Sequence, residues 1–264
     1  MLIVAERINA SRKSIGEAIK AKDADFIRVE AKAQAAAGAN YLDVNAGTFV
    51  GQEAEYLCWL AEVVQGVTDL PLCLDSPDAA AIAAALKKVK GRAMVNSITL
   101  EKRRLEGMLP LVKKYKTKIV ALCQSDKGMA NTINEKVSIA RQIVEILTKE
   151  GVALDDIYID PLIYPIATDT QSAVAALGAI EEIRQLFPGV HTIAGLTNIS
   201  FGLPVRKLIN RTFLVAAMAH GLDSAIIDPT DRELMASLIA AEAILARDKF
   251  CAGYITAYRK GKLS

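Results

Sequence analysis

The sequence predicts an α/β protein that folds as a closed (β/α)₈ TIM barrel, and three observations support this. Eight short apolar runs alternate with longer helical patterns along the chain. The runs are almost continuously hydrophobic, as strands buried on both faces of a parallel sheet are. The chain has 264 residues, of which 52% are hydrophobic. This is the size of one such barrel and allows a large core.

The expected elements alternate in order along the chain. Strands are predicted over residues 2–6, 41–45, 72–76, 93–97, 118–124, 157–161, 192–198 and 224–229. Helices are predicted over residues 23–38, 52–66, 78–89, 101–115, 132–151, 170–187, 204–220 and 231–248. Gly38 is a plausible C-cap of the first of these helices. The side chains of Ser76 or Asp78, Thr99, and Thr230 or Asp231 are suited to cap the N-termini of the helices that follow them. No linker or repeat divides the chain, so residues 1–264 are expected to form a single domain.

A doubly wound open sheet is the competing fold for a chain of alternating strands and helices. Such a sheet would more naturally carry a glycine-rich turn after an early strand, and no GxGxxG motif occurs. The eight units therefore favour the closed barrel.

Composition narrows the expected partners and the compartment. The net charge of +2 gives no reason to expect nucleic acid, and no apolar run is long enough to span a bilayer. The opening "MLIVAERINA" reaches a charge too early for a signal peptide. The four cysteines have no metal-ligand spacing, so we expect reduced thiols in a cytoplasmic protein.

Every predicted strand ends in an acid or an amide. In chain order these residues are Glu6, Asp43 with Asn45, Asp75, Asn96, Gln124, Asp160, Asn198 and Asp228. In a barrel the carboxyl ends of all strands meet at one mouth, where active sites lie. The sequence therefore predicts a mouth lined by hydrogen-bond acceptors and by amides that both donate and accept.

This set of side chains excludes several chemistries. No lysine ends a strand, and Lys118 stands at the opposite end of its strand, so a Schiff-base enzyme is not indicated. Acids and amides instead suit a flat, neutral heterocycle that carries N–H donors and one carbonyl. Two other readings remain open: single residues could cap the following helices, or several carboxylates could hold a divalent metal. Because amides separate the acids around the ring, we expect no metal.

The same strand ends carry a resemblance to a known family. The segments are "LIVAERIN", "GANYLDVNAG", "LPLCLDS", "RAMVNS", "IYIDPLI", "GLTNISFGLP" and "LINRTFLVAAMAHGLDSAIID". Together, in this order and over essentially the whole chain, they resemble the pterin-binding methyltransferases that act between methyltetrahydrofolate and a corrinoid protein. These include enzymes of acetogens and of anaerobic demethylation systems, with the folate domain of cobalamin-dependent methionine synthase more distant. The resemblance implies a pterin-binding barrel of the dihydropteroate synthase-like type.

The resemblance also implies roles for individual residues. Asp75, Asn96 and Asp160 match the side chains that hold the pterin ring. Gly195, Thr197 and Asn198 match the loop beside it, and Asn198 matches the amide that reaches N5. Possible supporting residues around them are Glu6, Asn9, Asp43, Asn45, Gln124 and Asp228.

Two stretches depart from relatives. Dihydropteroate synthases share the fold but use a late Ser-x-Arg-Pro pattern, and this chain reads "LPVRKLINR" instead, which argues against synthase chemistry. The stretch Ile199, Ser200, Phe201 and Gly202 matches a region near the corrinoid. A polar side chain, often Gln, is expected there near Phe201 or Gly202 and is missing, so the corrinoid contacts stay open.

The expected function is methyl transfer between N5 of tetrahydrofolate and the cobalt of a corrinoid protein, in either direction. Folate is then a substrate and the cobalamin is carried by the partner. Methyl loss from N5 requires a stabilised or protonated nitrogen, and Asn198 with ordered water is expected to provide this. The family also suggests a homodimer. The alternatives are a metal-dependent barrel lyase and a non-catalytic folate-binding subunit.

Overall fold

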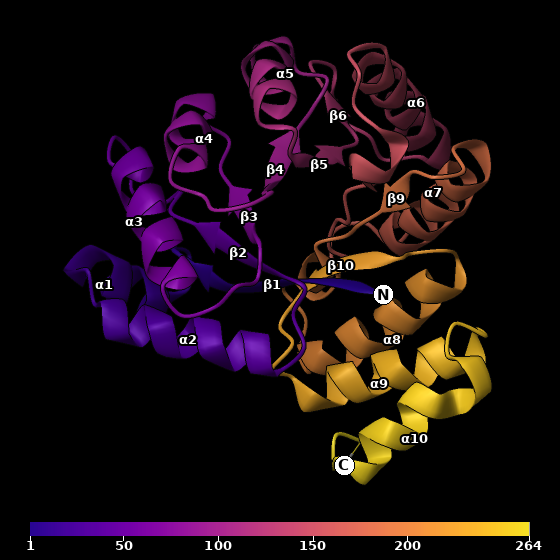
Figure 1. Ribbon diagram of the computed structural model, residues 1–264. Coiled ribbons are helices and arrows are strands. Elements are labelled where there is room, and N and C mark those ends of the chain that lie inside the picture. The colour runs from indigo at the N-terminus through magenta and orange to yellow at the C-terminus, as the bar shows by residue number, and fades with distance from the viewer. Residues whose placement is uncertain (264) are drawn as a thin grey trace.

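The computed structural model describes residues 1–263 and confirms the barrel. Eight parallel strands form one sheet in the order β10-β1-β2-β3-β4-β5-β8-β9. Figure 1 shows this sheet with the helices arranged around it. The strands are β1 Leu2–Asn9, β2 Tyr41–Asn45, β3 Leu72–Asp75, β4 Met94–Ile98, β5 Lys118–Leu122, β8 Ile157–Asp160, β9 His191–Thr192 and β10 Ser224–Ile227. The ring closes where Gly195, just beyond β9, pairs with Ile226 of β10.

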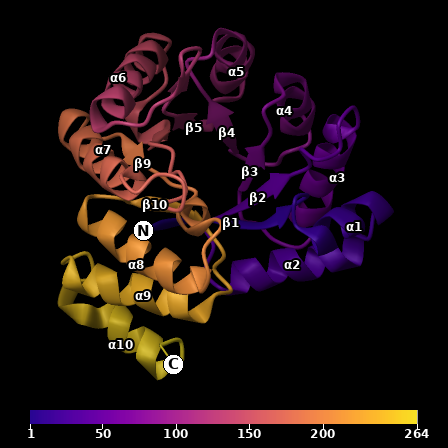
Figure 2. The ribbon, with the colours of Figure 1, turned by 180° about the vertical axis from the view of Figure 1, so that it is seen from behind.

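Helices cover the outside of the ring, as Figures 1 and 2 show from its two ends. They are α1 Lys13–Ala21, α2 Ala24–Ala36, α3 Glu53–Gln65, α4 Ala79–Leu86, α5 Lys102–Tyr115, α6 Ile133–Lys149, α7 Ser172–Leu186, α8 Arg206–Ala219, α9 Arg232–Ile244 and α10 Ala252–Arg259. Three short 3₁₀ helices complete the described chain: η1 Leu154–Asp156, η2 Leu196–Ser200 and η3 Lys249–Cys251. No described helix is long and apolar enough to cross a membrane.

Two layers of apolar side chains hold the barrel together. Inside the ring, nearly every strand contributes one buried residue: Val4, Tyr41, Cys73, Met94, Val120, Tyr158 and Ile193. Outside it, one cluster packs α1–α6 against β1–β8, and a second packs α7–α9 against β10 and η2. The alternation of inward and outward side chains along each strand therefore fixes which residues can reach the mouth.

Four features differ from the elements that the sequence predicts. Strand β1 continues past Glu6 to Asn9, with a bulge between Ala5 and Ile8 that lets both pack outward. Helices α1 and α10 are additional elements, and neither has a side-chain N-cap that would indicate its start in the sequence. The seventh strand is only His191–Thr192, and the rest of "TIAGLTN" leads into η2.

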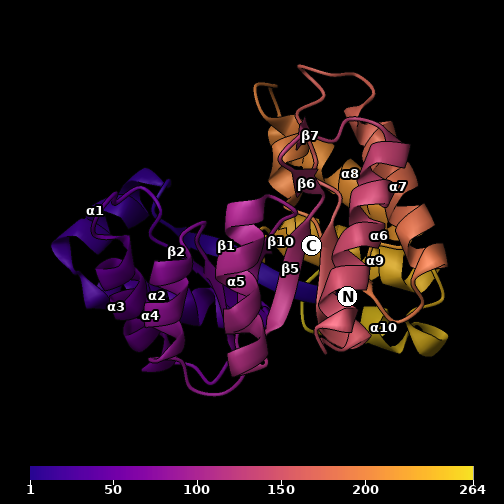
Figure 3. The ribbon, with the colours of Figure 1, turned by 90° about the horizontal axis from the view of Figure 1, so that it is seen from above.

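The fourth difference lies after β5, which ends at Leu122 instead of Gln124. The chain then forms an antiparallel hairpin from β6 Gln124–Ser125 and β7 Gly128–Met129. In Figure 3 this hairpin stands at the same end of the barrel as the loops that lead into α7 and α8. It therefore contributes to one side of the mouth.

The opposite end of the barrel is closed by a polar cluster around His191. Its ring stacks on Tyr158, with 4.7 Å between ring centroids, and Lys118 Nζ donates to the Tyr158 hydroxyl at 2.7 Å. His191 Nδ1 lies 2.8 Å from Asp223 and Nε2 lies 3.0 Å from Asp155. Lys118 thus faces away from the mouth, which agrees with the exclusion of Schiff-base chemistry.

The two carboxylates make His191 a pH-dependent contributor to stability. Hydrogen bonds to Asp223 and Asp155, opposed by burial, raise the pKa of His191 above 6.5. A group with a raised folded pKa stabilises the fold fully below its unfolded pKa and loses this contribution as pH rises through the folded value. We expect His191→Asn to lower the free energy of unfolding by about 1–2 kcal/mol at pH 5.5 and by clearly less at pH 9.

Urea unfolding at the two pH values measures this difference. His220→Asn is the matched control, because His220 pairs with Glu181 at the surface, where a single ion pair contributes little. A loss at pH 9 as large as the loss at pH 5.5 would show that His191 stabilises by packing alone.

Candidate functional site

The carboxyl ends of β2, β3 and β4 bring three polar side chains into one row. Asn45, Asp75 and Asn96 stand at paired positions on neighbouring strands. Asn45 Nδ2 donates to Asp75 Oδ2 at 2.8 Å, while Asn45 Oδ1 accepts from the backbone of Gly47. The Asp75 carboxylate is thereby oriented, and Asn96 beside it adds an amide to the same edge.

Asp43 lies one layer deeper, below this row. It is 2% exposed, and its Oδ1 atom is buried without a hydrogen-bond partner among the described residues. Burial, and then the nearby Asp75 charge, raise the pKa of Asp43 well above its ordinary value. Asp43 is therefore a supporting group under Asp75 and Asn96, and is shielded from the open end of the barrel.

Asp75, which is half-buried, and Asp160, which is buried, are two carboxyls at the level of the strand ends. Burial raises the pKa of each to about 6, opposed in Asp75 by the hydrogen bond from Asn45. In Asp160 the opposing contributions come first from the backbone N–H groups of Leu162 and Gly195. The two carboxyls approach the ring interior from β3 and β8, and each has partners that favour its charged form.

The η2 turn places the residues that follow the seventh strand. Gly195 precedes the turn, Thr197 is half-buried within it, and Asn198 is exposed. Asn198 Nδ2 lies 3.7 Å from the position that a Cβ on Gly195 would occupy. Gly195 and the Asn198 amide therefore lie beside each other at van der Waals distance.

Glu6 of β1 faces the same turn. Burial raises its pKa to about 7, opposed by Arg12 and Arg206 and by a hydrogen bond with the Thr197 side chain. A carboxyl with this pKa gains or loses a proton near neutral pH. The structure thus places a titrating group next to the residue that precedes Asn198.

Arg206, at the start of α8, holds η2 in place. Its Nη2 donates to the Thr197 carbonyl at 2.8 Å and its Nε donates to Ser200 Oγ at 3.0 Å. Ile199 and Ser200 are buried, with 1% and 0% exposed. The expected corrinoid contacts are therefore withdrawn for these two residues and kept for Phe201, which is 65% exposed, and for Gly202.

Three of the expected supporting residues bond to other residues of the protein. Asn9 accepts from the backbone and hydroxyl of Ser11, in a turn after β1. Gln124 lies in the hairpin and donates to Glu101 at 3.0 Å. Asp228 pairs with Arg7 at 3.0 Å. Although burial opposes this, hydrogen bonds from Thr230 and Arg7 hold the pKa of Asp228 below its ordinary value.

Sequence reasoning missed the basic residues near the mouth. Arg104, in the first turns of α5, has a buried Nε without a partner among the described residues. Burial lowers its pKa, while the charges of Glu101 and Asp75 oppose this. Arg104, Arg12 and Arg206 were all missed because each follows its strand end by several residues. The feature that could have identified them is their position at or near the start of the helix that follows each strand.

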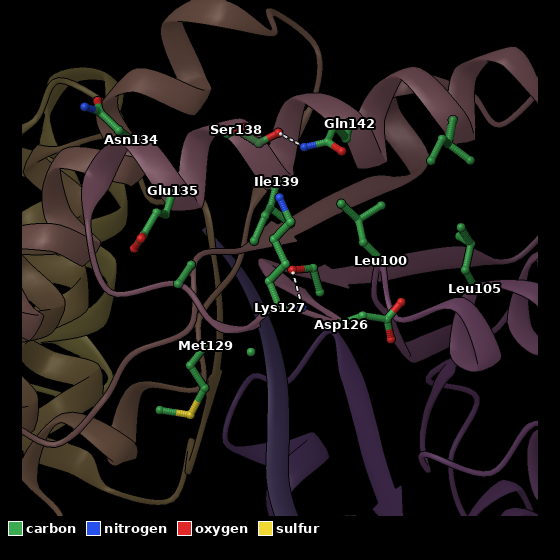
Figure 4. A pocket seen from close by; sticks show the side chains of 14 residues that line it. Leu100, Leu105, Asp126, Lys127, Met129, Asn134, Glu135, Ser138, Ile139 and Gln142 are labelled. Carbon is green, nitrogen blue, oxygen red and sulfur yellow. Dashed lines mark hydrogen bonds between the residues drawn. The ribbon is translucent and has the colours of Figure 1, made fainter.

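A cavity of about 610 Å³ lies outside the ring, between α5, the β6–β7 hairpin and α6. Figure 4 shows Lys127 and Met129 of the hairpin on one side of it, with Ser138 and Gln142 of α6 on another. None of the expected pterin-binding residues lines this cavity. Within residues 1–263, no group of three or more His, Cys, Asp or Glu side chains is arranged to hold a metal ion.

Comparison with known proteins identifies the family of the chain. Residues 5–228, which run from within β1 to the end of β10, match the family of pterin-binding enzymes. The chain belongs to this family. The family match spans the row at β2–β4, the Asp160 turn and η2, so these features lie within the shared domain.

Two curated relatives and two solved structures are informative. The chain is 38% identical to a methylcorrinoid:tetrahydrofolate methyltransferase of Eubacterium limosum, over 100% of this chain and 98% of the relative. It is 34% identical to methionine synthase of Mycobacterium tuberculosis over 86% of this chain, which spans 20% of that protein.

Dihydropteroate synthases of Clostridium difficile and Xanthomonas albilineans share the fold, with TM-scores of 0.75 and 0.71 at 20% and 18% identity. The aligned regions cover 92% and 93% of this chain and 96% and 93% of those structures.

The Asn45–Asp75 hydrogen bond yields a prediction about the pKa of Asp75. A donor to a carboxylate favours its charged form, so Asn45→Ala should raise the pKa of Asp75 above about 6. Carboxyl-selective infrared or NMR titration measures this, and Asp75→Asn identifies the signal by its disappearance. A pKa that is unchanged in Asn45→Ala would contradict the orienting role of Asn45.

Proposed function

We propose that this protein is a methyltransferase that moves a methyl group between N5 of tetrahydrofolate and the cobalt of a separate corrinoid protein. The end-to-end alignment with a methylcorrinoid:tetrahydrofolate methyltransferase carries the proposal. The buried acceptors at the mouth support it, because a pterin ring offers N–H donors to them. On this proposal the enzyme works in the cytoplasm of an anaerobic cell.

In this proposal the pterin ring lies across the mouth. Asp75 and Asn96 bind one part of the ring from β3 and β4, and Asp160 binds another from β8. In this proposal both accept hydrogen bonds as carboxylates, a form favoured by Asn45 at Asp75 and by backbone N–H groups at Asp160. Two fixed acceptors orient the ring, and orientation supplies a large part of the rate of a group transfer.

In this proposal the reaction at N5 takes place on the η2 side of the mouth. The corrinoid cobalt supplies the methyl acceptor or donor, and the nitrogen gains or loses a proton as the methyl group leaves or arrives. Asn198 is placed to bond N5, and Glu6, with a pKa of about 7 and a bond to Thr197, can exchange a proton near it. The exposed Phe201 and Gly202 are then the expected contacts of the corrinoid protein.

The direct test of the function is spectroscopic. A Co(I) corrinoid, mixed without oxygen with 5-methyltetrahydrofolate and this protein, should convert to methyl-Co(III), which is followed in the visible spectrum. Conversion that persists in a chelator separates this function from that of a metal-dependent lyase. Absence of conversion in both directions, with folate bound, would instead favour a non-catalytic folate-binding subunit.

Asn198 should act on the transition state more than on substrate binding. An unprotonated N5 is a weak partner for a neutral amide, and the bond strengthens as positive charge or an N–H develops. Asn198→Ala should therefore lower kcat by about tenfold to a thousandfold. Folate affinity, measured in the same variant, should fall less. Equal losses in affinity and in kcat/KM with kcat unchanged would mean that Asn198 only binds substrate.

We propose a homodimer, with an interface away from the mouth. Helices α8, α9 and α10 lie side by side (Figure 1), and the last two and η3 expose Ile244, Phe250 and Tyr258. Light scattering at micromolar concentration should give about twice 28.4 kDa. Ile244→Asp should shift the protein toward the monomer. A wild-type mass of 28.4 kDa would refute the proposal.

A further inference from the structure

Lys136 is a buried cation behind the mouth. It is 1% exposed, and within residues 1–263 it is the one lysine or arginine among the fully buried residues. It lies in the first turn of α6, after the Thr132 N-cap. Burying an ammonium group is unfavourable unless its donors find partners, so the contacts of Lys136 indicate what it is for.

The partners of Lys136 are carbonyls in the turn that follows Asp160. Its Nζ donates to the Pro161 carbonyl at 2.7 Å and to the Leu162 carbonyl at 2.9 Å, and it lies 4.7 Å from the centroid of the Tyr164 ring. The three contacts come from one short stretch after β8. Lys136 therefore connects α6 to the loop that carries one of the expected pterin ligands.

One peptide group joins Lys136 to Asp160. The carbonyl of Pro161 accepts from Lys136, and the N–H of the same peptide, which belongs to Leu162, donates to Asp160 Oδ1 at 2.8 Å. The peptide is thus polarised between a cation on one side and a carboxylate on the other. Hydrogen bonds in such a chain strengthen each other.

The turn needs such support because its backbone is strained. Leu162 has a φ of 57°, in the left-handed region that a leucine rarely adopts. Residues in this region persist when surrounding contacts hold them in place. The two carbonyl contacts of Lys136 lie on both sides of Leu162, so they hold the turn in which the Leu162 N–H donates to Asp160.

We propose that Lys136 is a positioning residue for pterin binding: through the Pro161–Leu162 peptide it fixes the Asp160 carboxylate in the orientation that accepts from the ring. This rests on the proposed function, in which Asp160 binds the pterin. Lys136 itself touches no substrate. Asp75 on the other side of the ring is held differently, by the side chain of Asn45, and is independent of Lys136.

A double-mutant cycle with 5-methyltetrahydrofolate tests the proposal. Lys136→Met removes the cation and keeps a long apolar side chain, and Lys136→Gln provides a second variant if the first does not fold. Folate affinity is measured by calorimetry in the wild type and in Asp160→Asn and Asp75→Asn backgrounds. Lys118→Met is the control, since the Lys118 side chain is only 18% exposed but contacts Tyr158 at the far end of the barrel.

We expect Lys136→Met to weaken folate binding by roughly threefold to a hundredfold. The KM should rise more than kcat falls. The effect should persist in the Asp75→Asn background and largely disappear in Asp160→Asn, because the group through which Lys136 acts is then altered. Lys118→Met should leave folate affinity within about twofold of the wild type.

Three outcomes would overturn the inference. The first is an equal loss of folate affinity from Lys136→Met in the Asp160→Asn background. The second is an equal loss of folate affinity from Lys118→Met. Failure of the proposed function is distinguishable, because Asp160→Asn alone would then leave folate affinity unchanged. Weak binding in Asp160→Asn with normal binding in both Lys136 variants would refute the role of Lys136 and leave the pterin assignment standing.

Discussion

Closure of the ring between β9 and β10 is the constraint on which the site depends. The seventh strand has only two residues, so the barrel is completed by a few backbone bonds beyond it. Ile193 donates to the Ile159 carbonyl and Ile226 donates to the Ala194 carbonyl, each at 2.9 Å. These bonds carry the chain directly into Gly195 and η2. Without them, the η2 turn and the strand ends of β8 and β10 would have no fixed distance from one another.

A second constraint is the burial of several carboxyl groups at one end of the barrel. Each buried acid would be unfavourable if left unpaired. The structure answers this differently at each position: an amide serves Asp75, backbone N–H groups serve Asp160, and an arginine serves Asp228. Burial raises the pKa values of Asp75, Asp160 and Glu6, and a different set of partners opposes this rise at each position. The roles in the proposed chemistry follow from these environments more than from residue type.

The fold and the main row of the site could be predicted from the sequence because both depend on short, regular patterns. Buried strands read as continuous apolar runs, and Asp75, Asn96 and Asp160 each stand where such a run ends. The seventh strand and Gln124 could not be placed in this way. Apolar residues after Thr192 are buried although they lead into a 3₁₀ helix, and the chain after Leu122 turns into a hairpin. Hydrophobicity alone therefore predicted strands that were too long at both places.

Groups that act from outside the strands were harder to find. Lys136 stands in a helix among many lysines, and nothing in its sequence neighbourhood separates it from surface residues. Arg104 and Arg206 likewise read as ordinary charged positions near helix starts. Their significance depends on which loop they pack against, and that is set by the tertiary fold. Lys136 is marked by its burial, Arg104 by its buried Nε and Arg206 by its hydrogen bonds to η2, and all three features are visible only in three dimensions.

The division of the outer core into two clusters has a consequence for how such enzymes diverge. Asp75 and Asn96 rest on strands packed by α1–α6, whereas η2, with Asn198, is packed within the cluster of α7–α9. In the proposed function, recognition of the ring and reaction at N5 are therefore built on two different apolar clusters, which meet at α7. Substitutions in one cluster can change the transferred group while the other continues to hold the same heterocycle. A barrel of this kind can acquire new reactions without losing its substrate class.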